Sequence, residues 1–143
     1  AEIVHCIVHQ HHGAPNRNNG SSFMVVWRST DAPAAPDANL AELAVLAFAR
    51  IVGAVQASPA LAAYRGHPRM QMKVCSDYHV TVSCCLHSGW AIEGALGSGY
   101  KVDASYLSPN VSVISAVKDA TALYGTCFLL TDATVASCTL RMR

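Results

Sequence analysis

The fold is decided by residues 90–125, which read WAIEGALGSGYKVDASYLSPNVSVISAVKDATALYG. Trp90–Leu96 and Tyr100–Leu107 are both bounded by turn residues, and this pattern predicts two strands. The glycine-rich bend between them is typical of a tight hairpin. No helix begins directly after it, as a phosphate-binding loop would require. Ser108-Pro109 then joins a capping residue to a first-turn proline, which predicts a helix over the rest of the stretch.

Toward the N-terminus, residues 1–12 carry apolar side chains at helical spacing, and Gly13 is predicted to end that helix. Asn19-Gly20 lies between the segments 14–19 and 22–28, which predicts a hairpin. The remaining elements expected are a surface loop over Ser29–Asn39, a helix over Leu40–Val55, a helical turn from Ser58-Pro59 to about Arg65, and strands over Met70–Cys75, Tyr78–His87 and Cys127–Leu130. Thr131–Arg143 shows little pattern. This order predicts an α/β or α+β sandwich, with helices packed on a mainly antiparallel sheet.

Composition narrows the class of protein further. A chain of 143 residues fits one domain, and 52% hydrophobic against 13% charged residues is typical of a globular fold. Ten basic and nine acidic residues give a net charge of +1, so there is no basic surface of the kind that follows phosphate backbones. Nucleic acid is therefore not an expected partner.

Membrane insertion is not expected either. The N-terminus lacks the features of a signal peptide, and the longest apolar stretch, Leu43–Ala49, is ended by Arg50 and is too short to span a bilayer. The six cysteines are scattered through hydrophobic runs without C-x-x-C spacing. This favours reduced, buried thiols in a cytosolic protein over a disulfide framework.

Two small constellations are candidates for chemistry. His5 and His9 lie four residues apart on one helical face and could share a metal, although a solvated helix end is the favoured interpretation. Cys84, Cys85 and His87 could form a nucleophilic site, but small cysteines inside a strand usually pack as hydrophobic residues. A structural role is therefore favoured for them.

Three segments of the chain belong together: GAPNRNNGSSF at 13–23, LHSGWAIEGALGS at 86–98, and residues 101–121 with DASYLSPNV at 103–111. They resemble the class III adenylate/guanylate cyclase domain, of the type found in large protist and algal proteins. The likeness runs in order and covers most of the chain. It identifies 1–143 as a single partial nucleotidyl cyclase homology domain. The implied fold is a ferredoxin-like sandwich lacking its first strand and working as a head-to-tail pair.

The resemblance also implies a reaction. In that family the ribose 3′ oxygen of a purine nucleoside triphosphate attacks the α-phosphate, at a site formed between two domains. Two Mg or Mn ions held by two aspartates activate the attacking oxygen and neutralise the phosphates. An Asn and an Arg from the facing surface bind the ribose and stabilise the transition state.

This chain departs from that pattern at the catalytic positions. The first metal aspartate is expected in a strand before Ala1, and the second aligns with Ser21. The family's Asn aligns with Ser112 and its Arg with Ala116, while the phosphate-binding lysine is expected beyond Arg143. A neutral hydroxyl is a poor ligand for a hard divalent cation, and alanine supplies no cationic donor. No metal or other cofactor is therefore expected, and Mg or Mn is expected only if the chain is an enzyme.

The purine-binding positions are partly kept. Arg17 stands where adenylate cyclases carry a Lys, and Ser105 stands at the second purine-binding position. A cation at Arg17 favours adenine over guanine, so ATP is the nucleotide expected if any binds. Both side chains are also compatible with a plain solvent-facing role.

The function predicted is a catalytically defective cyclase homology domain that pairs with another cyclase-type domain or a neighbouring protein, or serves as a structural or regulatory module of a larger protein. An apolar face near Phe23 and Trp90 is expected to be covered only by that partner. The alternatives are an active cyclase half completed by a partner domain, and a module that senses ATP without turning it over. The location expected is cytoplasmic, with possible tethering to a membrane or cilium through the rest of the parent protein.

Overall fold

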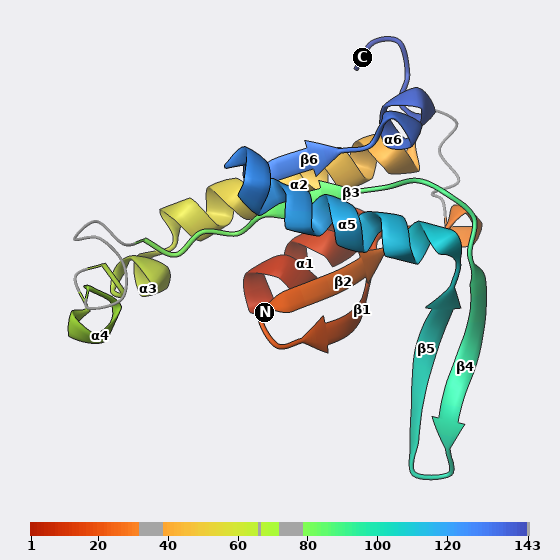
Figure 1. Ribbon diagram of the computed structural model, residues 1–143, viewed down its shortest axis with the longest axis horizontal. Helices are drawn as coiled ribbons and strands as arrows, with labels where there is room; N and C mark the ends of the chain where they lie inside the picture. Colours follow the sequence, from red (N-terminus) through yellow and green to blue (C-terminus); the bar gives the residue numbers. More distant parts are fainter. Residues whose placement is uncertain (32–38, 66, 72–78, 143) are drawn as a thin grey trace.

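The computed structural model describes residues 1–31, 39–65, 67–71 and 79–142 (Figure 1). The elements in chain order are α1 (Glu2–Gln10), β1 (Ala14–Asn19), β2 (Ser22–Val26), a 3-10 turn (Ser29–Asp31), α2 (Leu40–Ala57), α3 (Pro59–Ala62), α4 (Pro68–Gln71), β3 (Cys84–Leu86), β4 (Ile92–Ser98), β5 (Lys101–Leu107), α5 (Pro109–Tyr124), β6 (Phe128–Leu130) and α6 (Asp132–Ser137). Helices and antiparallel strand pairs make this an α+β fold, as expected.

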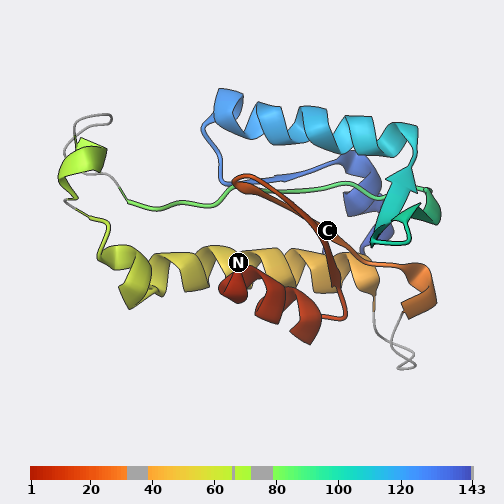
Figure 2. The ribbon, with the colours of Figure 1, turned by 90° about the horizontal axis from the view of Figure 1, so that it is seen from below.

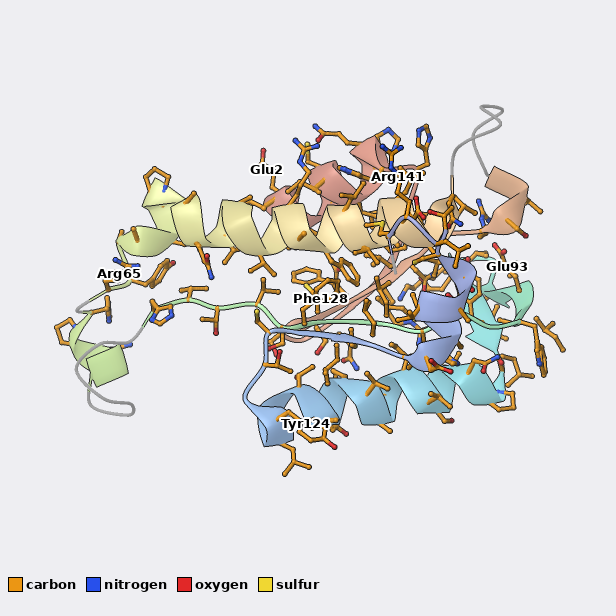
Figure 3. The ribbon with its side chains drawn as sticks, turned by 90° about the horizontal axis from the view of Figure 1, so that it is seen from above. Glu2, Arg65, Glu93, Tyr124, Phe128 and Arg141 are labelled. Carbon is orange, nitrogen blue, oxygen red and sulfur yellow. The ribbon has the colours of Figure 1, made fainter. Side chains whose placement is uncertain are left out.

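The helices α2 and α5 lie on either side of β3 and β6 (Figure 2). Phe128 of β6 points into the space between these two helices, whereas Tyr124 lies on the outer side of α5 near its end (Figure 3). The short N-terminal helix α1 packs along α2. The core therefore forms where α1, α2 and β3 meet.

Helix α2 supplies the centre of this core. Asn39 caps it, because the Asn39 Oδ1 atom accepts hydrogen bonds from the backbone N–H groups of Ala41 and Glu42. Its buried stripe consists of Ala44, Ala47, Phe48, Ile51 and Val55. By length and composition alone α2 could also cross a membrane, but a core helix passes the same test. The buried stripe is what a core helix requires.

Three aromatic rings join the core to the first hairpin. Trp27 meets Phe48 edge to face with ring centroids 5.6 Å apart, and Phe48 meets Phe128 in the same way at 6.0 Å. The indole N–H of Trp27 donates to the His11 carbonyl at 2.9 Å. The hairpin β1–β2 is thereby fixed against α2 and the end of α1.

The strands of the described residues form three two-stranded pairs. The pairs β1–β2 and β4–β5 are antiparallel, and β3–β6 is parallel. The mainly antiparallel character is therefore confirmed, whereas the parallel pair was not anticipated. A parallel pair needs a long crossover, and here β4, β5 and α5 all lie between its two strands.

Gly13 has a different role from the predicted one. The helix ends at Gln10, and His12, not Gly13, takes the left-handed conformation with φ 60°. A Cβ atom on Gly13 would lie 2.6 Å from Cε2 of Trp27 and 2.7 Å from Cγ1 of Val8. Glycine is required there because Trp27 and the helix approach its backbone closely.

The predicted strands between α3 and β4 are mostly wrong. Pro68–Gln71 forms a helical turn where a strand was expected from Met70, and residues 72–78 lie outside the described part of the chain. Of the predicted strand Tyr78–His87, only Cys84–Leu86 pairs with another strand. Val80 and Val82 instead pack against the core as single side chains. Most of the predicted loop Ser29–Asn39 also lies outside the described residues.

The C-terminal segment is more ordered than its pattern indicated. It contains α6, whose Thr134 is 1% exposed. Asn39 donates to the Ser137 carbonyl at 2.8 Å, and Glu42 accepts from both the N–H and the hydroxyl of Thr139. These Thr139 bonds lower the pKa of Glu42. They fix the end of α6 to the beginning of α2.

The five described cysteines are free thiols, as predicted, but not all are buried. Cys84 and Cys138 are buried, Cys85 is half-buried, and Cys6 and Cys127 are exposed. Cys75 lies outside the described residues.

Candidate functional site

The turn of the first hairpin carries Ser21, the residue that the resemblance aligns with a metal aspartate. Asn19 pairs with Ser22, so Gly20 and Ser21 form a two-residue loop. Gly20 has φ 59°, and glycine at the first central position is typical of a type II′ turn. Ser21 is exposed at this tip. The sequence therefore placed Ser21 correctly at the end of a hairpin.

The residues around Ser21 do not fit Mg or Mn. The Ser21 side chain is a neutral hydroxyl, whereas hard divalent cations are held mainly by carboxylates. Among the described residues, no three His, Cys, Asp or Glu side chains gather as metal ligands. We therefore derive no catalytic step through a metal.

Arg17 and Ser105 lie on neighbouring segments, β1 and β5. The register of β1–β2 shifts between Pro15 and Arg17, so Asn16 is the extra residue of a β-bulge. The bulge directs the Asn16 amide toward β5, where Nδ2 donates to the Ala104 carbonyl at 2.9 Å. Arg17 and Ser105 directly follow these two linked residues. Arg17 is exposed and Ser105 is half-buried.

The Asn16 amide donates to Ala104 but leaves its own oxygen atom unpaired. Its Oδ1 atom is buried without a hydrogen-bond partner. Burying an unpaired polar atom costs about 1–3 kcal/mol. The amide orientation is nevertheless fixed, because turning it over would set Oδ1 against the Ala104 carbonyl oxygen.

Ser112 and Ala116 lie on the exposed side of α5, one helical turn apart. The helix is well defined at both ends. Ser108 Oγ accepts from the Asn110 N–H at 3.1 Å, and Gly125 ends the helix with φ 62°. Within the described part of the chain, no hydrogen bond or ion pair joins Ser112 or Ala116 to Ser21, Arg17 or Ser105. Ala104 and Ser105 lie on opposite faces of β5, so the hydrogen bond from Asn16 to Ala104 joins the strands that carry Arg17 and Ser105 without bringing these two side chains together.

A charged cluster joins the first hairpin to β4 and β5. Arg28 Nη1 and Glu93 Oε1 are 2.7 Å apart, and each side chain is 38% exposed. Tyr106, directly opposite Glu93 in the ladder, hydrogen-bonds with both of them. Burial and then the Glu93 carboxylate raise the pKa of Tyr106, whereas Arg28 lowers it. The phenol therefore stays protonated and donates to Glu93.

His87 links three elements and has no ring nitrogen left for a nucleophile. Its Nδ1 atom lies 2.9 Å from Thr131 Oγ1, and its Nε2 atom lies 2.9 Å from Asn110 Oδ1. Asn110 Nδ2 donates to the Trp90 carbonyl at 2.8 Å. This network holds the beginning of α5 and the start of β4 against the end of β3.

The two cysteines beside His87 are unsuited to nucleophilic catalysis. Burial, followed by the neighbouring thiols of Cys85 and Cys127, raises the pKa of Cys84 to about 12. Burial also raises the pKa of Cys85, whose Sγ lies 3.9 Å from the Ile114 carbonyl. Thiolates are the reactive form, so these thiols are structural, as the sequence favoured.

His5 and His9 of α1 lie in different surroundings. His5 meets the Phe23 ring edge to face at 5.7 Å, and its Nε2 lies 3.3 Å from Asn18 Oδ1. His9 and His12 line an open hollow of about 390 Å³ with Gly13 and Ala14. His5 therefore steadies the hairpin, and the structure gives it no ligand shared with His9.

Sequence analysis missed Asn16, Arg28, Glu93 and Tyr106 as partners. Arg28 and Glu93 are 65 residues apart, and no local pattern connects them. The one available signal was alternation, because Glu93 and Tyr106 fall on the same face of the predicted hairpin.

The fold was compared with known proteins. No family model matches the sequence, and no curated protein matches it. Two solved structures of a bacterial light-regulated adenylyl cyclase are similar to this chain. One has a TM-score of 0.70 at 16% sequence identity over 98% of this chain, and the other 0.69 at 17% over 96%. This chain spans 36% and 35% of the lengths of those proteins. The chain therefore has a cyclase-like α+β fold.

Proposed function

We propose that this chain is a nucleotidyl cyclase homology domain that is catalytically defective and acts by pairing with another cyclase-type domain. One observation carries the proposal. A cyclase-like fold is combined with neutral side chains at Ser21, Ser112 and Ala116, the positions where the resemblance implies a carboxylate, an amide and a guanidinium. The scaffold is kept while the groups that would perform the chemistry are replaced.

The chemical consequence follows from what those groups supply. Loss of one preorganised transition-state donor typically lowers the rate by about 10²–10³-fold. Ser21 cannot contribute a negative charge to a two-metal site, and Ala116 cannot offset the charge that develops on the phosphates. The combined losses place turnover far below that of an active cyclase.

The pairing surface is the outer face of β4–β5. Every residue of β4 is exposed, and the ribbon projects away from the rest of the fold (Figure 1). Ile92 and Leu107 are directly opposite each other, and alternation places Leu96 on the same face. Together with Trp90, just before β4, they are 61–73% exposed. We call these four residues the outer arm face, and β4–β5 the arm.

Phe23 is not part of that surface. It packs partly buried against the core and meets His5 within the same chain. The partner-covered face expected near Phe23 and Trp90 is thus reduced to the Trp90 side. A cluster of exposed apolar residues on a projecting ribbon is typical of an interaction site. A second copy of the chain is the simplest cyclase-type partner.

The catalytic half of the proposal is tested with ATP or GTP and Mn²⁺, measuring cyclic nucleotide and pyrophosphate. The chain is expected to form neither, beside an active adenylyl cyclase as a positive control. Sustained formation of cyclic AMP or cyclic GMP by the chain alone would overturn the proposal.

One observation favours a second candidate, an active half completed by a partner domain. The hydrogen bond from Asn16 to Ala104 places β1 next to β5, and these two strands carry the purine-binding candidates Arg17 and Ser105. Mixing the chain with an active cyclase domain separates the two functions. Arg17→Ala should leave the activity of the mixture unchanged if the chain only pairs, and should lower it if Arg17 contacts the purine.

A further inference from the structure

The arm has two faces with different surroundings. Glu93, Ala104 and Tyr106 lie on one face, and the apolar outer arm face lies on the other. The first of these, which we call the inner arm face, contacts the β1–β2 region at two separate points. The orientation of the arm therefore depends on residues of the first hairpin.

The two contacts differ in chemistry. At one, the Arg28 guanidinium donates to the Glu93 carboxylate at 2.7 Å, and the Tyr106 hydroxyl bonds to both. At the other, the bulged Asn16 donates to the Ala104 carbonyl at 2.9 Å. The Asn110–Trp90 hydrogen bond holds the base of the ribbon, and these two contacts add to it along the inner arm face. The two contacts come from residues on either side of β2 in the sequence. Together they fix the angle between the arm and the first hairpin.

The orphaned acceptor of Asn16 supports this interpretation. A buried unpaired Oδ1 destabilises the fold, so the side chain is not there for stability alone. The β-bulge that carries Asn16 also directs it out of the regular strand, which is a common use of bulges beside functional sites.

We propose that Asn16, Arg28, Glu93 and Tyr106 form a clamp that sets the angle of the arm and so holds the outer arm face in the orientation required for pairing. These four are positioning residues, since they act on the partner only through the arm. The inference rests on the proposed pairing function. The experiment therefore measures the arm angle and the pairing separately.

The arm angle is followed as the distance between two spin labels, measured by pulsed electron spin resonance. The labels are attached to p-acetylphenylalanine, which replaces Tyr64 and Tyr100. Both tyrosines are exposed, one in the body and one at the tip of the arm, and this chemistry avoids the native cysteines. Pairing of the unlabelled chain is measured by sedimentation equilibrium. The variants are Arg28→Glu, Glu93→Arg, their double combination, and Tyr106→Phe.

Each single charge reversal is expected to broaden or shift the distance distribution and to weaken pairing by about fivefold or more. The double variant should restore both, and Tyr106→Phe should give a smaller change in the same direction without risk to folding. Reversing Lys118 and Asp119, an exposed ion pair of 3.1 Å on α5 and outside the arm, is the matched control and should change neither.

An unchanged distance distribution in the single reversals and in Tyr106→Phe would overturn the clamp. An altered distribution with unaltered pairing would also overturn it, because the angle would then not matter to the partner. If the wild-type chain itself does not pair at any concentration, the proposed function fails, and the distances still decide whether the clamp sets the angle.

Discussion

The two antiparallel hairpins of this chain have the same local structure and opposite surroundings. The β1–β2 hairpin has Phe23, Val25 and Trp27 packed against the core. The β4–β5 arm exposes all of β4 and most of β5. An isolated two-stranded ribbon is marginally stable in water, so an exposed apolar ribbon is retained for something other than its own stability.

The difference shows where the two kinds of function lie in the proposed account. The hairpin carries Arg17 and Ser21, which the resemblance aligns with purine-binding and metal positions, and Ser21 has a neutral side chain where the resemblance implies a carboxylate. The arm carries the outer arm face, and there the apolar residues remain exposed. The first hairpin packs against the core of its own chain, whereas the apolar face of the arm is available to a partner.

Substitution of the two tryptophans is expected to give the largest difference between the hairpin regions, because each region carries one. Trp27→Ala removes a ring packed on Phe48 and a hydrogen bond to His11, and should lower the free energy of unfolding by about 3 kcal/mol. Trp90 is 64% exposed, so Trp90→Ala should change the free energy of unfolding by no more than about 0.5 kcal/mol. Urea unfolding followed by circular dichroism measures both.

Each tryptophan variant is the control for the other. Measurements at low protein concentration keep pairing from contributing to stability. Equal destabilisation by the two substitutions would contradict the contrast, because it would mean that the arm packs as tightly as the first hairpin.

Two glycines sharpen the comparison with a smaller effect. Gly13→Ala would place a Cβ atom 2.6 Å from Trp27, and should lower the free energy of unfolding by about 1–3 kcal/mol. Gly94 of the arm has no atom within 4 Å of the equivalent position, so Gly94→Ala should be tolerated within about 0.5 kcal/mol. Thermal unfolding of the two variants beside the wild type measures the difference. A well-tolerated Gly13→Ala would show that Trp27 can move away from the hairpin.

The parts of the fold predicted from sequence are those fixed by local chemistry. The hairpin at Asn19-Gly20, the Ser108-Pro109 helix start and the Gly125 helix end each depend on neighbouring residues. All three are confirmed, although the turn itself is Gly20-Ser21 and not Asn19-Gly20. The apolar spacing of residues 40–55 predicted the helix α2. Of its buried stripe, it predicted Ala47, Ile51 and Val55 but not Ala44 and Phe48.

The rest depends on contacts between distant residues. The parallel pairing of Cys84–Leu86 with Phe128–Leu130 joins segments more than 40 residues apart, and no turn residue fixes it. Strand patterns in Tyr78–His87 indicated apolar side chains correctly, but not that most of them lack a neighbouring strand. The short helix α6 is fixed largely through the contacts of Asn39 and Glu42 with its C-terminal end.

The candidate site also has one part that the local sequence predicts and one part that depends on contacts between distant residues. Helical spacing alone places Ser112 and Ala116 on one face, and the hairpin turn alone places Ser21 at a tip. The clamp between Arg28 and Glu93 and the bulge at Asn16 come from the meeting of two hairpins. Their roles require the three-dimensional structure, because register shifts and ion pairs between hairpins leave no local sequence pattern.

The central claim, that the outer arm face is a pairing surface, is tested most directly by sedimentation equilibrium of the wild type and Leu96→Asp over a wide concentration range. Leu96 is 69% exposed, so the substitution should leave the fold intact, which circular dichroism verifies. The account predicts that the wild type forms dimers as concentration rises and that Leu96→Asp stays monomeric. A wild type that remains monomeric throughout, or a Leu96→Asp variant that pairs as tightly as the wild type, would contradict it.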